Sequence, residues 1–137
     1  MKPSTANPAP GYKKYPAHRI TTKPAGVRVL VKYIGEVIAD TRDAIATEEE
    51  SKSGSVVGPI VYYIPRKDVK MERLTRTTHS THCPFKGEAS YYTLSTDNLT
   101  VANAAWSYEQ PYDEMSVIKE RLAFYPDKVV SISVVQE

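Results

Sequence analysis

The sequence predicts a mainly β protein, a single compact domain of short antiparallel strands with one or two short helical turns. Three observations predict this class. Apolar residues alternate over short runs such as Val27–Tyr33, β-branched and aromatic residues fill Ile60–Ile64, and turn-forming residues separate these runs at short intervals. With 137 residues, of which 25% are charged and 41% apolar, the chain has the size and composition of one globular domain.

Residues 1–16 are predicted to form a flexible basic arm, and residues 17–137 the β-rich domain. The arm is rich in proline, alanine, lysine and tyrosine and has no apolar period, so only Tyr12, Tyr15 and Pro16 would hold it against the domain. Seven basic residues and no acid precede Glu36, so the rest of the chain carries a net charge of −5 against +2 overall. Such an arm can contact phosphate or an acidic partner, or fold back on its own acidic domain.

The first half of the domain is predicted to contain a short strand at His18–Thr22 and a half-buried strand at Val27–Tyr33. Ile34-Gly35 separates the second strand from Glu36–Asp40, a spacing typical of a β-hairpin.

Another short strand is expected at Ala44–Thr47. The acidic stretch Glu48–Ser55 is predicted to be a loop, because a run of three glutamates is usually a solvated surface. Ile60–Ile64 is the strongest predicted strand and ends at Pro65. Arg66–Arg76 has apolar residues at a spacing that suits one or two helical turns.

In the second half, Lys86–Tyr92 is predicted to be a strand that pairs with Thr100–Tyr108 after a turn. Antiparallel pairing would bring the end of the second strand, Ala105–Tyr108, close to the start of the first. A helical turn is predicted at Met115–Arg121. Two closing strands, Leu122–Tyr125 and Val129–Val134, are predicted to be joined by a turn at residues 126–128.

The stretch His79–Tyr92 gathers the most chemically capable side chains, including the only cysteine and two of the three histidines. Strand alternation would put Lys86, Glu88, Ser90 and Tyr92 on one face, which either forms a site or is a solvated surface. The glycine at position 87 would allow a ligand or another backbone segment to approach closely.

The candidate catalytic residues are Cys83, Lys86 and Glu88, although no reaction follows from them and enzymatic activity stays open. Cys83 is either a nucleophile activated by His79 or His82, or a small buried residue at a turn. Lys86 and Glu88 either position an anionic substrate and transfer a proton, or form an exposed ion pair.

The candidate ligand-binding residues form an aromatic and polar cleft around the Cys-Pro-Phe-Lys-Gly-Glu motif. Trp106 and Tyr108 would share a strand face and form a wall beside Lys86. The full set is Tyr63, Lys86, Glu88, Tyr92, Trp106 and Tyr108. The predicted function is therefore a domain that binds an unidentified small molecule.

The alternative function is a non-enzymatic interaction module that binds a protein or nucleic acid through the basic arm and the tyrosine-rich surface. Nucleic acid is the less expected partner, because the chain lacks the combined basic and aromatic motif of a known module.

Composition also excludes several classes. One cysteine excludes an internal disulfide and multi-cysteine zinc fingers, and it suits a reducing compartment. His79, His82 and Cys83 supply at most three ligands and two of them are adjacent, so neither a metal nor a cofactor is expected. No run approaches the roughly 18 apolar residues of a membrane span, and the start of the chain lacks a signal-peptide pattern, so the expected location is the cytoplasm.

Several segments, in this order, resemble an uncharacterised family known as domain of unknown function 427. The resembling segments are Gly35–Asp40, Tyr62–Val69, Thr81–Tyr92, Ala105–Pro111 and Ala123–Pro126 with Val129. The resemblance spans roughly Ile20 to Val134 and implies a compact fold similar to the β-tent (Mss4-like) architecture. The stretch between Glu50 and Ile60 is longer than in the family pattern.

The resemblance implies no established activity. Several relatives with the β-tent architecture bind zinc through paired CxxC motifs, and this chain has neither pair. A nucleotidyltransferase activity, sometimes attributed to the family, would need clustered carboxylates that hold magnesium on a triphosphate. Asp40 and Asp43 come nearest to such a cluster, and both are explained by turns.

Overall fold

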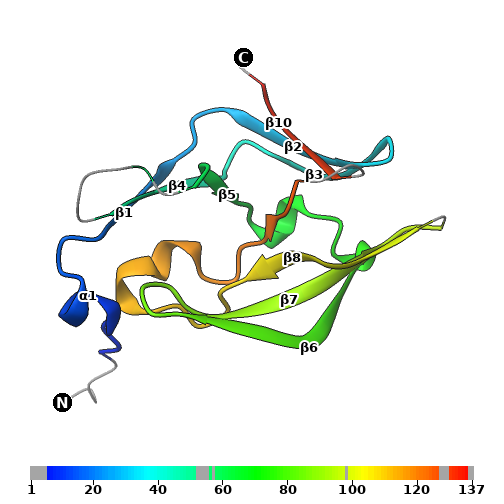
Figure 1. Ribbon diagram of the computed structural model, residues 1–137. Coiled ribbons are helices and arrows are strands. Elements are labelled where there is room, and N and C mark those ends of the chain that lie inside the picture. The colour runs from blue at the N-terminus through cyan, green and yellow to red at the C-terminus, as the bar shows by residue number, and fades with distance from the viewer. Residues whose placement is uncertain (1–5, 52–55, 57, 98, 127–129, 136–137) are drawn as a thin grey trace, which may run out of the picture.

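Three antiparallel sheets make up the structure, a computed structural model that describes residues 6–51, 56, 58–97, 99–126 and 130–135 (Figure 1). Their strand orders are β1-β4-β5, β10-β2-β3 and β6-β7-β8-β9. The strands are β1 Arg19–Pro24, β2 Arg28–Tyr33, β3 Glu36–Thr41, β4 Ile45–Glu50, β5 Val61–Tyr63, β6 Leu74–Cys83, β7 Gly87–Ser95, β8 Thr100–Ser107, β9 Ala123–Phe124 and β10 Val130–Val135.

The helical pieces are short: α1 Gly11–Lys14 and the 3₁₀ turns η1 Arg66–Asp68, η2 Met71–Arg73 and η3 Asp113–Ile118. The predicted mainly β class, with antiparallel strands and short helical turns, is therefore confirmed. No helix among the described residues is long and apolar enough to cross a membrane. Parts of several predicted elements fall outside the described residues, among them positions 1–5 of the arm, 52–55 of the acidic loop, 127–128 of the closing turn and 129 of the last predicted strand.

The predicted hairpin joins β2 to β3. Ile34 and Gly35 have φ values of 45° and 82°, and two successive positive φ values are typical of a type I′ turn, whose twist matches that of paired strands. Tyr33 pairs with Glu36 across this turn. Buried residues alternate along β2, as the apolar pattern predicted.

The acidic run is strand rather than loop at its start, so the loop prediction was wrong for residues 48–50. β4 continues to Glu50 and pairs with β1, with Thr21 opposite Glu48 and Arg19 opposite Glu50. The Glu49 carboxylate contacts His18 and Lys86, which lie far away in the sequence, so local composition does not reveal these contacts.

The third sheet corrects the predicted start of the central strand. β7 begins at Gly87, and Lys86 belongs to the turn that precedes it, so the prediction that Lys86 shares a strand face with Glu88 was wrong. The two central strands pair as predicted, but Tyr91 lies opposite Trp106, so Ala105–Ser107 pairs with the end of the predicted Lys86–Tyr92 strand and not with its start. β8 ends at Ser107, so Tyr108 lies just beyond the strand.

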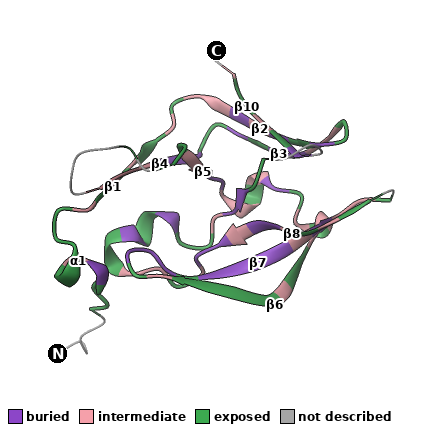
Figure 2. Ribbon diagram, in the orientation of Figure 1, coloured by how far each residue is buried: buried purple, intermediate pink, exposed green. Residues whose placement is uncertain are grey.

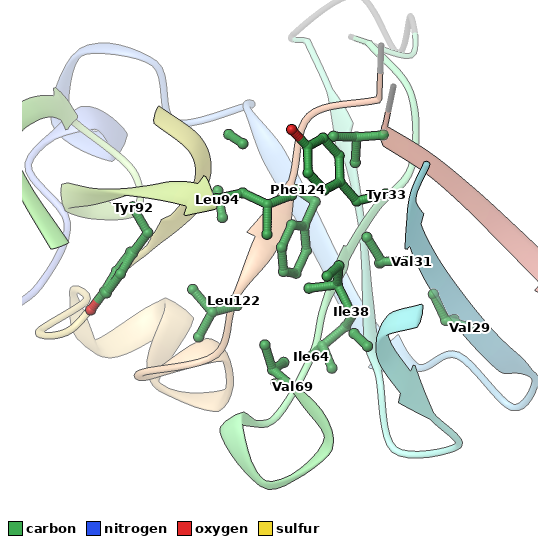
Figure 3. Close-up of a cluster of buried hydrophobic side chains, with 14 of the residues drawn as sticks. Val29, Val31, Tyr33, Ile38, Ile64, Val69, Tyr92, Leu94, Leu122 and Phe124 are labelled. Atoms are coloured by element: carbon green, nitrogen blue, oxygen red, sulfur yellow. The ribbon is translucent and has the colours of Figure 1, made fainter. Parts of the chain in front are cut away.

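Two hydrophobic clusters fill the interior. β7 is buried along most of its length, whereas its neighbour β6, at the edge of the sheet, is largely exposed (Figure 2). The larger cluster joins β2 and β3 to the third sheet, and Figure 3 shows Val31 and Ile38 facing Leu94 and Phe124. The second cluster lies on the opposite face of β7, where Tyr91 packs.

The described part of the arm contacts the domain. Tyr12 packs edge-on against Phe85 with ring centroids 5.0 Å apart, and Tyr15 lies 6.4 Å from the same ring. Ala9 and Gly11 are buried. This arrangement differs from the loosely attached arm that the composition predicts.

Candidate functional site

The turn Pro84–Lys86, which joins β6 to β7, is held by the chain's own backbone. Gly87 follows it with φ 120°, and a Cβ there would lie 3.3 Å from the carbonyl oxygen of Gln110. The backbone N–H of Tyr112 donates to the carbonyl of Lys86 over 3.0 Å. The close approach that glycine permits at this position is therefore made by residues 110–112.

Lys86 is engaged with a carboxylate rather than open to solvent. Its ammonium donates to Oε1 of Glu49 in β4, and the residue is 9% exposed. Nε2 of His18 lies 3.1 Å from the other oxygen of the same carboxylate. The His18 ring stacks on Phe85 with centroids 4.0 Å apart. Lys86 thus links the turn to the first sheet.

Glu88 does not join this group. It is exposed on β7, opposite His82 in the register of β6 and β7. The predicted row of neighbouring side chains therefore begins at Glu88 and continues through Ser90 and Tyr92, without Lys86.

An aromatic group lies in the second cluster. The ring of Tyr63 lies 6.4 Å from that of Trp106, edge-on, and 6.3 Å from that of Tyr108. Burial raises the pKa of both Tyr63 and Tyr108 above the ordinary value, and the nearby Glu49 carboxylate adds to the shift. These phenols therefore stay protonated near neutral pH and are not acid–base groups there.

A pocket of about 500 Å³ opens beside this group, between the edge strands β5 and β9 and the sheet that contains β2 and β10. Its lining is almost wholly apolar and includes Val61, Tyr62, Trp106, Phe124, Tyr125 and Ile132. Trp106 and Tyr125 pack against each other with centroids 4.3 Å apart. Volume and lining are both typical of small-molecule sites.

The pocket lining contains few polar atoms. Burial, together with the neighbouring Tyr91 hydroxyl, raises the pKa of Tyr125 to about 12. The pocket therefore offers ring surface more than hydrogen-bonding groups.

A polar network that the sequence analysis missed lies on the other face of β7. The Glu109 carboxylate accepts hydrogen bonds from the Tyr92 hydroxyl at 2.6 Å, from Arg76 at 2.9 Å and from the Ser90 hydroxyl at 3.1 Å. Arg66 reaches the same carboxylate at 3.4 Å.

Electrostatics keep this network ionised. Burial alone would raise the pKa of Glu109, but the hydrogen bonds from Tyr92, Arg76 and Ser90 outweigh it and hold the pKa below its ordinary range. Burial and the hydrogen bond to Glu109 raise the pKa of Tyr92. Arg66 and Glu109 both fall within the segments that carry the family resemblance. That resemblance was the sequence feature that could have pointed to this network.

The candidate catalytic residues are dispersed. Cys83 is half-buried against the second cluster. His82 hydrogen-bonds the Tyr112 hydroxyl at 2.7 Å, and the His79 ring lies 4.5 Å from that of Tyr91. Among the described residues, no hydrogen bond joins Cys83 to either histidine, and no three His, Cys, Asp or Glu side chains cluster as metal ligands.

The structure does not bring the six predicted ligand-binding residues together. Tyr63, Trp106 and Tyr108 meet in the second cluster, whereas Lys86 pairs with Glu49 and Glu88 is exposed. Tyr92 belongs to the larger cluster on the opposite face of β7, and its hydroxyl points away from the other labelled side chains in Figure 3. Of the six, Trp106 lines the pocket of about 500 Å³.

Comparison with known proteins supports the family resemblance of the sequence motifs. No curated protein matches the chain. A family model described as a domain of unknown function, DUF427, matches residues 21–135, which covers the three sheets and most of the chain. The chain therefore belongs to the DUF427 family.

Proposed function

We propose that this protein binds an apolar small molecule with a planar, aromatic portion in the pocket lined by Trp106 and Tyr125. The observation that carries the proposal is the size of the pocket, about 500 Å³, combined with its aromatic and aliphatic lining. Pockets of roughly 300–1,000 Å³ with such a lining bury most of a small ligand. The proposal is binding alone; no reaction is assigned.

The chemistry of the lining supports a planar ligand. Because the lining is almost wholly apolar and includes Trp106 and Tyr125, a ligand would meet mainly ring faces and aliphatic groups. Aromatic rings prefer offset or edge-on contact with other rings, which a flat apolar molecule provides.

The proposed pocket differs in place from the cleft expected around Lys86. Pro84–Lys86 is covered by the chain's own backbone and by Glu49, whereas Trp106 connects the second cluster to the pocket. The β-tent architecture and the cytoplasmic location stay part of the proposal and are supported by the family resemblance and the single cysteine.

Trp106 provides the test, because it is the only tryptophan in the sequence. An apolar fluorescent probe, anilinonaphthalene sulfonate, should bind with a stoichiometry near one per chain and accept excitation energy from Trp106. Ile132→Phe fills the pocket from β10 and should weaken binding of the probe at least tenfold. Native mass spectrometry of the purified protein would detect a ligand that stays bound.

Val134→Phe is the matched control, because Val134 lies two positions further along β10, is 42% exposed and does not line the pocket. It should leave probe binding unchanged. Equal effects of the two substitutions, or binding that is unaffected by Ile132→Phe, would contradict the proposal.

A further inference from the structure

In residues 7–11 of the arm, prolines alternate with other residues, and the segment leads into the short helix α1 at Gly11. Residues 7–11 read Asn-Pro-Ala-Pro-Gly, and the two prolines have no backbone N–H. Each of the three remaining N–H groups donates to the domain. The bonds are Asn7 to Oδ2 of Asp113 at 2.6 Å, Ala9 to Oε1 of Glu114 at 2.9 Å and Gly11 to the carbonyl of Pro84 at 2.9 Å.

Burial follows the same period of two. Ala9 is 5% exposed and Gly11 is buried, whereas Pro8 and Pro10 are exposed. A Cβ at position 11 would lie only 2.6 Å from the ring of Phe85. The surface therefore accepts small residues at alternate positions, and glycine at the position that faces Phe85.

The residue after the glycine adds an aromatic contact. The Tyr12 ring packs edge-on against Phe85, at an interplanar angle of 66°. Burial raises the pKa of Tyr12, and the charges of Glu114 and Glu49 raise it further, so the phenol lies near acidic groups. Lys13 and Lys14 follow and are exposed.

The arm precedes the segment that matches the family model, whereas the surface that receives it lies within that segment. The family match begins at residue 21, after the arm, whereas Phe85, Asp113 and Glu114 lie within the matched segment. The receiving surface is thus part of the family domain, and its occupant is attached in front of that domain.

We propose that Pro84, Phe85, Asp113 and Glu114 form a peptide-binding groove for segments of the pattern Pro-x-Pro-Gly-aromatic, and that residues 7–12 occupy it in cis. The two prolines have a restricted φ, so the free peptide loses less conformational entropy on binding. A tethered segment has an effective concentration in roughly the millimolar range. The arm therefore excludes free peptides of the same pattern until it is displaced.

The test uses the full-length chain and a fluorescein-labelled peptide of residues 6–18. Gly11→Val places a branched side chain against Phe85, and Ala9→Asp places a carboxylate beside Glu114, so both variants should release the arm. Faster trypsin cleavage after Lys13 or Lys14 would report the release. Fluorescence polarisation should then show that both variants bind the wild-type peptide at least tenfold more tightly than the wild-type protein does.

The same peptide carrying Gly11→Val is the matched ligand control and should not bind the opened variants. Ala17→Val, at an exposed arm position, should behave as the wild-type protein. Three outcomes would overturn the proposal: unchanged cleavage in both opened variants, no peptide binding by variants whose arm is released, or equally tight binding by the wild-type protein.

Discussion

The ammonium of Lys86 donates to the carboxylate of Glu49, which lies 37 positions earlier in the chain. The pair joins the turn between β6 and β7 to β4, so it connects the third sheet to the first. The side chains of Lys86 and Glu49 are 11% and 23% exposed, respectively. A charged pair in this setting is sensitive to the loss of either member, because the remaining charge is left without its partner.

We therefore expect Lys86→Met to lower the free energy of unfolding by about 3 kcal/mol, the lower end of the range for breaking a buried pair. Glu49→Gln should cost a similar amount, and the double variant should recover much of the loss. Urea denaturation of the single and double variants measures this coupling.

Glu88→Gln is the control, because Glu88 is exposed and is not part of the pair. Its free energy of unfolding should stay within about 0.5 kcal/mol of the wild-type value. Additive losses in the Lys86 and Glu49 double variant would show that the two residues act independently, contrary to the role assigned to them.

The local sequence pattern was enough to predict strands whose alternating apolar residues and turn residues are adjacent in the chain. The β2–β3 hairpin follows from an alternating strand and from Ile34-Gly35, which adopts the turn that such a pair favours. The run Glu48–Glu50 misled the prediction because the side-chain partners of Glu49, His18 and Lys86, are not local.

The sequence predicted the part of the candidate site that depends on one conspicuous side chain. Trp106 was singled out as an aromatic side chain near the central strand, and it lines the pocket. The Glu109 network was missed because Arg66, Arg76 and Tyr92 reach one carboxylate from three separate elements. That convergence depends on sheet register and on the bulge in β6, which a single sequence does not specify.

The Glu109 network predicts a specific acid response. Because the folded-state pKa of Glu109 lies below the ordinary value of 4.5, its contribution to stability is present above that pH and is lost as the pH falls through the folded-state pKa. Glu109→Gln should reduce the free energy of unfolding at pH 7 by about 1–2 kcal/mol. This value is the range for hydrogen bonds to charged groups, reduced because the Glu109 side chain is partly exposed. The difference from the wild-type protein should shrink between pH 5 and pH 3.

Urea midpoints at a series of pH values test this response. Asp97→Asn is the matched control, because the Asp97 side chain is 92% exposed and its nearest cation is 3.9 Å away. It should reproduce the wild-type profile. A difference between Glu109→Gln and the wild-type protein that stays constant down to pH 3 would mean that the ionised carboxylate does not stabilise the fold.

The buried tyrosines predict an alkaline response of the opposite sign. Burial raises the pKa of Tyr63 above its ordinary value of 10.0, so above that pH the folded protein retains a proton that the unfolded chain has lost. Stability is therefore complete below about pH 10 and falls as the pH rises further.

Tyr63→Phe keeps the ring and removes the titrating group, so urea midpoints measured from pH 9 to 11.5 should fall less steeply than in the wild-type protein. Tyr15→Phe, at a position that is 45% exposed, should leave the slope unchanged. Equal slopes for Tyr63→Phe and the wild-type protein would show that the Tyr63 phenol ionises in the folded state as readily as in the unfolded chain.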